Sequence, residues 1–495
     1  MQTGEPLDVL IVGAGISGIG MAAHLAARCP GKRYAIIERR GRIGGTWDLF
    51  RYPGVRSDSD MFTLGYGFEP WRDKRAIAPG NVIRDYLADV ADRRGIAEHI
   101  RFGQTVVSAD WNSADGLWTL TMEDASGGVS TLSGKFLFLG AGYYDHDDPH
   151  EAEIPGLADF SGLTIHPQFW PDSFDYTGKN IIVIGSGATA VSLVPALAET
   201  AGHVTMLQRT PTWYLIRPEH DRLANLLARI LPAGWAHRLN RFKNAALQNT
   251  FVQRSRSRPA AVKAFLHAKL AEALGPDFDR KDFTPPYDPW NQRMCLVPDG
   301  DLFAAMRAGK ASIVTARIGK VDRAGVVLQD GRRLDADVIV TATGLRLAVL
   351  GKIAVSLDGQ PVDFGERYYY RNCMFSNVPN LAALFGYLSA GWTLRVDLVS
   401  DWLCRLFNQM DAWGVDVAVP RLRDDHALDE DDVFAVFSSG YLRRGRHLFP
   451  KSATTAPWRI SMDYMKDRAE MRDAPIDDGV LQFEKAVRER VCAAE

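Results

Sequence analysis

The residues best suited to chemistry in this chain are the glycines of two turns that have the spacing of phosphate-binding loops. The first turn lies in DVLIVGAGISGIGMAAHL, where an apolar run precedes Gly13, Gly15 and Gly18 and a run of small residues follows. Gly13 permits a tight turn, Gly15 lets backbone amides approach a pyrophosphate, and Gly18 lets the following helix pack closely on the strand. The spacing predicts a strand–turn–helix unit that binds a dinucleotide, and the alternative is a glycine-containing turn without a ligand.

The second turn lies in KNIIVIGSGATAVSLVPAL and repeats the pattern. Gly185 and Gly187 occupy the first two positions, and Ala190 takes the third small position. Ala188 and Thr189 begin the expected helix, so their backbone amides are also candidates for binding phosphate. The sequence therefore predicts two dinucleotide sites.

The residue that ends the second strand of each unit differs between the two sites. In the first unit YAIIE ends at Glu38, whose carboxylate suits a ribose diol. In the second unit HVTMLQRT ends with Arg209 and Thr210, and a guanidinium pairs with a 2'-phosphate that an acid would repel. We expect FAD at the first site and NADP at the second; the alternative for Arg209 is a solvated residue at a strand end.

Composition sets limits on partners and domain number. A chain of 495 residues with 46% hydrophobic residues can bury the cores of two or three domains. The 58 basic and 60 acidic side chains nearly cancel, which argues against a nucleic-acid partner.

The cysteines predict neither a metal site nor a disulfide reductase, because they are scattered without a CxxC pair or metal-ligand spacing. Reduced, structural thiols favour a cytoplasmic location. They are Cys29, Cys295, Cys373, Cys404 and Cys492.

Two apolar stretches, residues 9–27 and 180–198, approach the length of a membrane span. Each carries one of the glycine turns at its centre, so each is better explained as strand, turn and helix. Glu5 and Asp8 precede the first apolar run, which argues against a signal peptide.

These elements predict an α/β fold with two Rossmann-like dinucleotide-binding domains. We expect residues 1–150 and 336–495 to form the FAD-binding domain around an NADP-binding domain at 151–335, with a helical insertion at about 213–289. Residues 332–345, RRLDADVIVTATGL, look like a β-hairpin that ends in Gly344 and Leu345. Their ATG turn resembles the one that closes the FAD domain of two-dinucleotide flavoproteins at the flavin end.

The stretch FSGLTIHPQFWP, residues 160–171, contains two prolines and little β-alternation, so we interpret it as a linker. It resembles the Baeyer-Villiger monooxygenase form FxGxxxHxxxW(P/D), whereas flavin-containing monooxygenases have Tyr or Phe in place of the tryptophan. The resemblance implies a hinge between the two domains, with His166 as a hydrogen-bonded residue of the hinge. The matching residues are Phe160, Gly162, His166, Trp170 and Pro171.

A second pattern of that family is met by GGTWDLFRYPGVRSD. Its matching residues, with Thr46 inside the turn, are Gly45, Trp47, Tyr52, Pro53, Gly54 and Asp58. The chain is thus identified by resemblance as a class B flavoprotein monooxygenase, and its segments GTWDLFRYPG, RSDSDM and QRMCLVP are similar to those of the ethionamide-activating branch.

The resemblance implies that NADPH reduces FAD, oxygen adds at flavin C4a, and the resulting peroxide converts a ketone to an ester or lactone, with sulfide oxidation as a second activity. It also implies that Arg293 stabilises the anionic species and that Asp58 orients this guanidinium. The alternatives are that Asp58 caps a helix and Arg293 is a surface ion-pair member. As whole-protein alternatives, a flavin-containing monooxygenase acting on sulfur or nitrogen, an uncoupled NADPH oxidase and a non-catalytic NADP sensor stay open.

One region carries no recognisable motif. Residues 222–269 contain ten Lys or Arg and no Asp or Glu, and Pro232 and Pro259 mark breaks between expected helices. The sequence favours a solvated helical cap packed on the NADP-binding domain over a substrate lid or a membrane-surface patch. Thr393, at the start of a later amphipathic helix, is a further candidate near the flavin.

Overall fold

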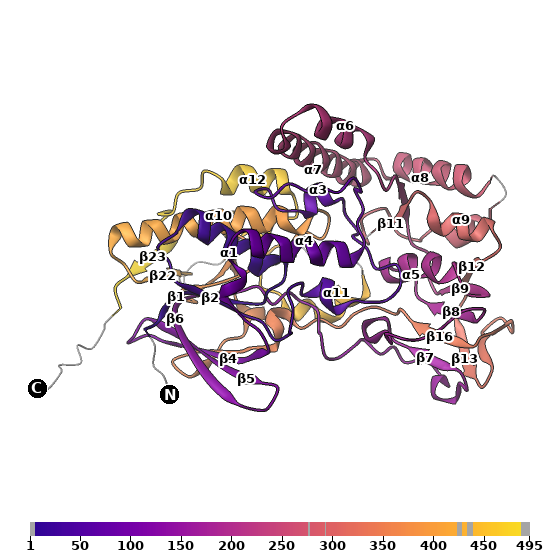
Figure 1. The fold of residues 1–495 in the computed structure, drawn as a ribbon, viewed down its shortest axis with the longest axis horizontal. Coiled ribbons are helices and arrows are strands. Elements are labelled where there is room, and N and C mark those ends of the chain that lie inside the picture. Colours follow the sequence, from indigo (N-terminus) through magenta and orange to yellow (C-terminus); the bar gives the residue numbers. More distant parts are fainter. Residues whose placement is uncertain (1–4, 276–277, 293, 423–427, 433–438, 487–495) are drawn as a thin grey trace, which may run out of the picture.

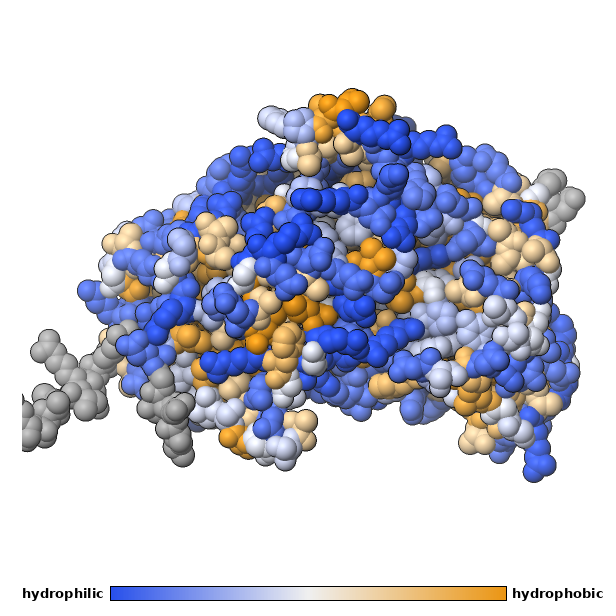
Figure 2. All heavy atoms as spheres, viewed as in Figure 1, coloured by the Kyte–Doolittle hydropathy of each residue, from blue (hydrophilic) through white to orange (hydrophobic). Residues whose placement is uncertain are grey.

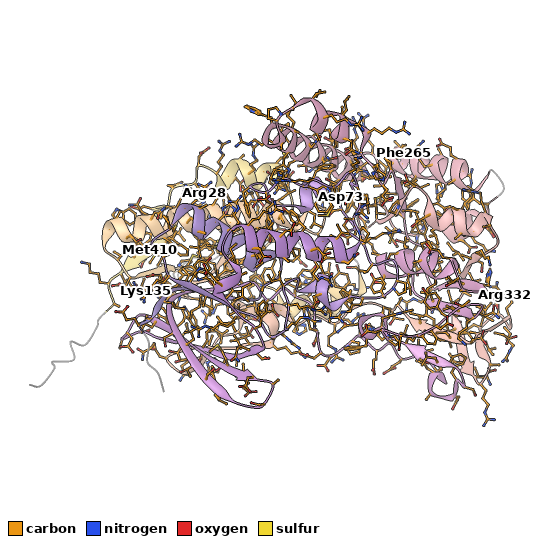
Figure 3. The ribbon with its side chains drawn as sticks, in the orientation of Figure 1. Arg28, Asp73, Lys135, Phe265, Arg332 and Met410 are labelled. Carbon is orange, nitrogen blue, oxygen red and sulfur yellow. The ribbon has the colours of Figure 1, made fainter. Side chains whose placement is uncertain are left out.

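The computed structural model describes residues 5–275, 278–292, 294–422, 428–432 and 439–486. Two sheets organise this part of the chain and follow one another along its long axis (Figure 1). Lys135, on the first sheet, and Arg332, beside the second, lie near opposite ends of the molecule (Figure 3). The predicted α/β architecture with two Rossmann-like units is confirmed.

The first sheet has 11 strands and a parallel centre in which β1 pairs with β2 and β6. Val9, Leu10 and Ile11 of β1 are all buried, as expected for a parallel strand covered on both faces. The antiparallel strands β4 and β5 extend the sheet from β6. Its strands are β1 (Leu7–Val12), β2 (Tyr34–Ile37), β3 (Ile100–Arg101), β4 (Gln104–Asn112), β5 (Leu117–Asp124), β6 (Val129–Leu139), β17 (Ala354–Leu357), β18 (Gln360–Pro361), β19 (Tyr369–Tyr370), β20 (Met374–Phe375) and β21 (Leu381–Ala383).

The second sheet has five parallel strands in the order β12, β9, β8, β16 and β7. Its strands are β7 (Leu163–Ile165), β8 (Asn180–Ile184), β9 (His203–Gln208), β12 (Ala311–Thr315) and β16 (Val338–Thr341). Three smaller sheets complete the set: β10 (Tyr214–Arg217) with β11 (Cys295–Pro298); β13 (Ile318–Asp322), β14 (Gly325–Leu328) and β15 (Arg333–Asp335); and β22 (Val417–Pro420) with β23 (Leu481–Glu484).

Helices cover the sheets. α1 packs on α10 so closely that a Cβ on Gly20 would lie 2.4 Å from Val396. The helices are α1 (Ile16–Arg28), α2 (Thr46–Leu49), α3 (Met61–Leu64), α4 (Gly80–Arg93), α5 (Ala188–Ala198), α6 (Arg222–Ile230), α7 (Ala233–Ser257), α8 (Pro259–Leu274), α9 (Asp301–Arg307), α10 (Trp392–Trp413), α11 (Gly440–Gly445) and α12 (Tyr464–Met471). Short 3-10 turns lie at Ala97–His99, Leu157–Asp159, Pro167–Phe169, Arg280–Phe283, Phe364–Glu366 and Arg446–Leu448. Among the described residues, no helix has the length and apolar character needed to cross a bilayer.

Two local predictions from the sequence are wrong. Part of the stretch interpreted as a linker is β7, an edge strand paired with β16, because its short run ending in buried Ile165 has a partner that local patterning cannot reveal. The expected hairpin at 332–345 is instead divided between two sheets: β15 pairs antiparallel with β14, and β16 pairs parallel with β8. The five-stranded sheet therefore continues to Thr341, beyond the boundary predicted at 335.

The cap formed by α6, α7 and α8 does not pack only on the NADP-binding side, as the sequence favoured. α7 packs on α3 and α12, which lie on the side of the first sheet, whereas α8 packs on α9. Arg241 of α7 is buried and pairs with Asp397 of α10 at 2.6 Å. His237 makes a hydrogen bond to the Tyr66 carbonyl at 2.9 Å. Polar residues of α7 that the sequence predicted to be solvent-exposed are thus buried, and they bind this helix to α10 and to the segment around Tyr66.

Candidate active site

A large cavity of about 1040 Å³ is lined by strand ends from both sheets. All but one of the described residues predicted to bind a cofactor lie on its wall. They are Gly13, Gly15, Glu38, Gly45, Thr46, Trp47, Asp58, Gly185, Gly187, Ala188, Thr189, Arg209, Thr210, Gly344 and Leu345. The exception is Gly18, which lies behind the first turn.

The first turn is shaped by glycines for which a side chain has no room. Gly13 has φ +97°, and a Cβ there would lie 2.9 Å from the Gly140 carbonyl oxygen. A Cβ on Gly18 would lie 1.9 Å from the Gly13 carbonyl oxygen, so the third glycine permits the close packing of helix on strand. Helix α1 begins after Gly15 with no side chain capping its first amides, which leaves them available to an anion at the cavity wall.

Glu38 braces this first turn. Its side chain is 4% exposed and accepts hydrogen bonds from the Ala14 amide at 2.7 Å and the Arg40 amide at 2.8 Å. Burial raises the pKa of Glu38, and the two amides oppose that shift. The carboxylate therefore has a structural task in addition to any contact with a ligand.

The GGTW segment lies directly against the first turn. Gly45 has φ +54°, and a Cβ there would lie 3.1 Å from the Cα of Gly15. The following helix, α2, begins at Thr46 and includes Trp47. Asp48 of the same helix is buried and pairs with Arg40 at 2.7 Å, which ties the segment to the residues that follow β2. Gly15 and Gly45 thus lie next to each other on the cavity wall. Neither has a side chain that would keep a ligand away from the backbone.

The second turn is similar in outline and more open. Gly185 has φ +146°, and a Cβ there would lie 2.2 Å from the Ala342 carbonyl oxygen, whereas a Cβ on Gly187 would meet nothing within 4 Å. Helix α5 begins after Gly187 without a side-chain cap. The Ser186 hydroxyl donates to the Thr210 carbonyl at 2.9 Å and links the turn to the end of β9. The uncapped amides and the open space above them fit a phosphate group.

Arg209 follows β9 and is exposed at the rim of this cavity. Within the part of the chain that the structure describes, no carboxylate lies within ion-pair distance of its guanidinium. Its charge is thus available to a ligand phosphate.

Asp58 lies on the cavity wall, and it is not the helix cap that the sequence left open as an alternative. Asp60 caps α3 instead, accepting a hydrogen bond from the Thr63 amide at 3.0 Å. Arg293 lies outside the described residues. Its neighbours in sequence Gln292 and Cys295 line the same cavity as Asp58.

None of the five motif residues of the stretch 160–171 lines this cavity. Phe160 and Gly162 pack together, since a Cβ on the glycine would lie 2.5 Å from the ring of Phe160. His166 accepts a hydrogen bond from the Gln168 amide at 3.2 Å, and burial lowers the pKa of its imidazole. The Trp170 ring centroid lies 6.5 Å from that of Tyr176.

Behind the cavity, this motif joins the two sheets. Gln168 donates to the Asp145 carbonyl at 2.9 Å, in the segment after β6 of the first sheet, while Ile165 belongs to β7 of the second. Pro171 is exposed beyond this contact. A movement of one sheet relative to the other would therefore change the conformation or the contacts of these residues.

The cavity has an aromatic wall that was not predicted from the sequence. Tyr143, Tyr144, Trp392 and Tyr441 line the cavity, and the Trp392 indole donates to the Ser17 hydroxyl at 2.9 Å. A signal was present, because the segment GAGYYD follows β6 as a third glycine turn.

Thr393 is not part of the cavity wall, contrary to its selection as a candidate. Its buried hydroxyl lies 2.9 Å from the Thr63 carbonyl oxygen and 2.7 Å from the Gly65 carbonyl oxygen, and these two acceptors share its one proton. It therefore fixes α10 against α3, and its neighbour in sequence, Trp392, lines the cavity instead.

The described residues contain no cluster of three or more His, Cys, Asp or Glu that could hold a metal ion.

Comparison with solved structures defines the class of fold. An oxidized steroid monooxygenase bound to NADP is 22% identical, with a TM-score of 0.74, over 97% of this chain and 100% of the other. An ε-caprolactone-bound cyclohexanone monooxygenase is 20% identical, with a TM-score of 0.73 and the same coverage. Residues 10–222 match the family model described as pyridine nucleotide-disulphide oxidoreductase. The chain thus has the fold of these two monooxygenases.

Two curated relatives settle the family. The FAD-containing monooxygenase EthA of Mycobacterium tuberculosis is 47% identical over 484 residues, which cover 97% of this chain and 98% of the relative. The probable FAD-binding monooxygenase AlmA of Acinetobacter baylyi is 44% identical over 480 residues, covering 97% and 96%. The chain belongs to the class B flavoprotein monooxygenases, and the resemblance seen in its motifs is confirmed.

Proposed function

We propose that the first turn binds FAD and that the second binds NADPH. The observation that carries this assignment is the shared cavity, whose wall includes both uncapped helix N-termini. Gly13, Gly15 and the Gly45 segment would hold the flavin dinucleotide, with Gly344 and Leu345 near its isoalloxazine end. Arg209 would select NADPH through the 2'-phosphate, because a guanidinium pairs with that group and an acid does not.

We propose that the reaction is a Baeyer-Villiger oxidation. A ketone, NADPH, a proton and O2 give an ester or lactone, NADP and water, so one oxygen atom enters the carbon–carbon bond next to the carbonyl and the other leaves as water. When bound, the reduced flavin supplies the activated oxygen. Sulfides are a second substrate class, because the same activated oxygen can be transferred to sulfur.

The proposed tasks of the chain's own residues concern charge and access. Arg293 would stabilise the negative charge that develops on the carbonyl oxygen under attack, and Asp58 would orient that guanidinium. The aromatic wall around Tyr143 and Trp392 would exclude water from the reacting atoms. The segment from Phe160 to Pro171 would act as the hinge that lets the nicotinamide approach the flavin and then withdraw.

Comparison of two substrate classes in Arg293→Ala tests this proposal. Ketone oxygenation requires stabilisation of an oxyanion, so we expect it to fall on the order of 100-fold or more, as when an oxyanion donor is removed. Sulfide oxidation creates no such oxyanion at the substrate and should fall much less. Asp58→Asn should lower ketone turnover in the same direction and to a smaller extent.

Arg293→Lys is the matched control, because it keeps the charge and loses the fork-shaped guanidinium. Equal survival of both activities in Arg293→Ala would contradict the assignment. It would favour a flavin-containing monooxygenase acting mainly on sulfur or nitrogen. Release of all consumed oxygen as hydrogen peroxide from the unmodified enzyme would indicate an NADPH oxidase.

A further inference from the structure

Helix α7 has an inverted distribution of polar and apolar side chains. Its inward face carries His237, Asn240, Arg241 and Asn244, all less than 10% exposed. Its outward face carries Trp235 at 62%, Leu239 at 46% and Phe242 at 52% exposure, at spacings of four and three residues that place them in one stripe. A helix of a water-soluble domain normally buries its apolar face, so this arrangement requires a reason.

Helix α6 continues the same surface. Leu223, Leu226 and Ile230 are 52%, 52% and 66% exposed and share one face of the helix, while Ala224 is its one buried residue. α6 packs on α7, and an apolar cluster stands at the upper edge of the molecule over α6 (Figure 2). We call the six side chains on α6 and α7 the apical patch. Phe265 of α8, 47% exposed, lies on the same upper side (Figure 3).

Positive charge surrounds the apical patch. Residues 222–269 contain no Asp or Glu, and Arg222, Arg229 and Arg238 are exposed on the two helices of the patch. In the described part of the chain, no carboxylate lies within ion-pair distance of these three guanidinium groups. The Arg238 guanidinium lies 5.9 Å from the Trp235 ring centre, so cation and aromatic ring face the solvent together. The patch therefore offers apolar and cationic contacts to one partner.

We propose that the apical patch binds the surface of an anionic lipid bilayer. A tryptophan, leucines and an isoleucine on one face, with arginines beside them, are the composition of helices that lie in the membrane interface. A bilayer accepts the apolar side chains below its headgroups while anionic headgroups pair with the arginines. The polar inward face of α7 then serves to hold these residues outward, through the Arg241–Asp397 pair and the His237 hydrogen bond.

Co-sedimentation of the purified holoenzyme with vesicles tests the proposal. Vesicles of phosphatidylcholine mixed with phosphatidylglycerol should bind the protein, and phosphatidylcholine alone should bind it far less. Ile230→Glu should reduce the partition coefficient on the order of tenfold, because an exposed aliphatic side chain that would enter the bilayer is replaced by a charge. The triple change Arg222→Gln, Arg229→Gln and Arg238→Gln should reduce it about fivefold for each arginine, and added salt should have the same effect.

Matched control variants distinguish binding through the apical patch from nonspecific binding to vesicles. Val129 on β6 is 66% exposed, as Ile230 is, so Val129→Glu should leave vesicle binding unchanged. Changing the exposed Lys310, Lys320 and Arg323 to Gln together removes three positive charges that lie outside α6 and α7 and should have little effect. Each variant should keep its bound flavin and its melting temperature.

Three results would overturn the proposal. One is failure of the wild-type protein to bind anionic vesicles at low salt. Another is an equal loss of binding in Val129→Glu and Ile230→Glu. The third is a dimer, measured by light scattering, that Ile230→Glu converts to a monomer while vesicle binding is absent, because the patch would then be covered by a second copy of the chain.

Discussion

The two glycine turns share a sequence pattern and differ in how closely the surrounding protein packs on and hydrogen-bonds to each turn. In the first turn Glu38 accepts hydrogen bonds from two backbone amides, and a Cβ on Gly18 would overlap the Gly13 carbonyl oxygen. In the second turn Arg209 is exposed at the cavity rim, and Ala190 occupies the position equivalent to Gly18 with its Cβ accommodated.

The difference indicates two modes of binding at one cavity. The first turn is closely packed at Gly18 and hydrogen-bonded to Glu38, which suits a dinucleotide that stays bound through many turnovers. The second turn has open space over Gly187 and a cation at its rim, which suits a ligand that enters and leaves. The proposed hinge between the two sheets is consistent with a ligand that exchanges at the second turn while the dinucleotide at the first turn stays bound.

The largest expected effect comes from exchanging the third small residue between the turns. Gly18→Ala places a methyl group 1.9 Å from a backbone oxygen and should destabilise the protein by about 3 kcal/mol or more, with loss of bound flavin. Ala190→Gly should cost only about 1 kcal/mol, the usual cost of glycine inside a helix. Urea denaturation measures both, and equal losses would remove the contrast in packing.

Arg209→Ala should affect the second site alone. Loss of a charge-assisted contact to the 2'-phosphate, worth about 2 kcal/mol, should raise the KM for NADPH about 30-fold. The KM for NADH, which lacks that phosphate, should stay nearly constant, as should the flavin content. Steady-state kinetics with both cofactors decides, and a parallel change in the two KM values would show that Arg209 does not read the phosphate.

Glu38→Gln should loosen the first site without disturbing the second. The amide side chain keeps the shape of the carboxylate, but its single carbonyl oxygen can accept from only one of the Ala14 and Arg40 amides, which now donate to different oxygens. The other amide then faces an NH2 group, a loss of about 1 kcal/mol or more. Flavin affinity measured on the reconstituted apoprotein should fall about fivefold, with the KM for NADPH unchanged. An unaltered flavin affinity would mean that the brace is dispensable.

Acid should lower the stability of the folded protein by a smaller amount. Burial, with Arg39 and Arg40 nearby, lowers the pKa of His146 from 6.5 to about 4, and this residue lines the cavity beside the first turn. The unfolded chain takes up this proton below about pH 6.5 while the folded chain does not, so stability falls as the pH drops from 6.5 toward 4. Between pH 8 and pH 6 the loss should be about 0.8 kcal/mol.

The control for this acid effect is His146→Gln, in which that part of the pH dependence should vanish in denaturation curves. An identical pH profile in the variant and the parent would assign the acid sensitivity to other groups.

Local patterns predicted most of the cavity, whereas features set by distant partners could not be predicted. The glycine turns, Glu38 and Arg209 could be found because a phosphate-binding turn constrains residues within a few positions of one another. β7 was missed because its partner, β16, lies far along the chain. The inverted face of α7 was missed because the buried partner of Arg241 is Asp397, on a helix that the sequence pattern does not connect to it.

The most direct test of the central claim is the fate of labelled oxygen. The purified enzyme would be supplied with NADPH, ¹⁸O₂ and a panel of linear and cyclic ketones, with products analysed by mass spectrometry. The proposed reaction predicts one labelled oxygen atom in an ester or lactone for each NADPH consumed, and near-complete loss of that product in Arg293→Ala. Consumption of NADPH with labelled hydrogen peroxide and no oxygenated ketone product across the panel would contradict it.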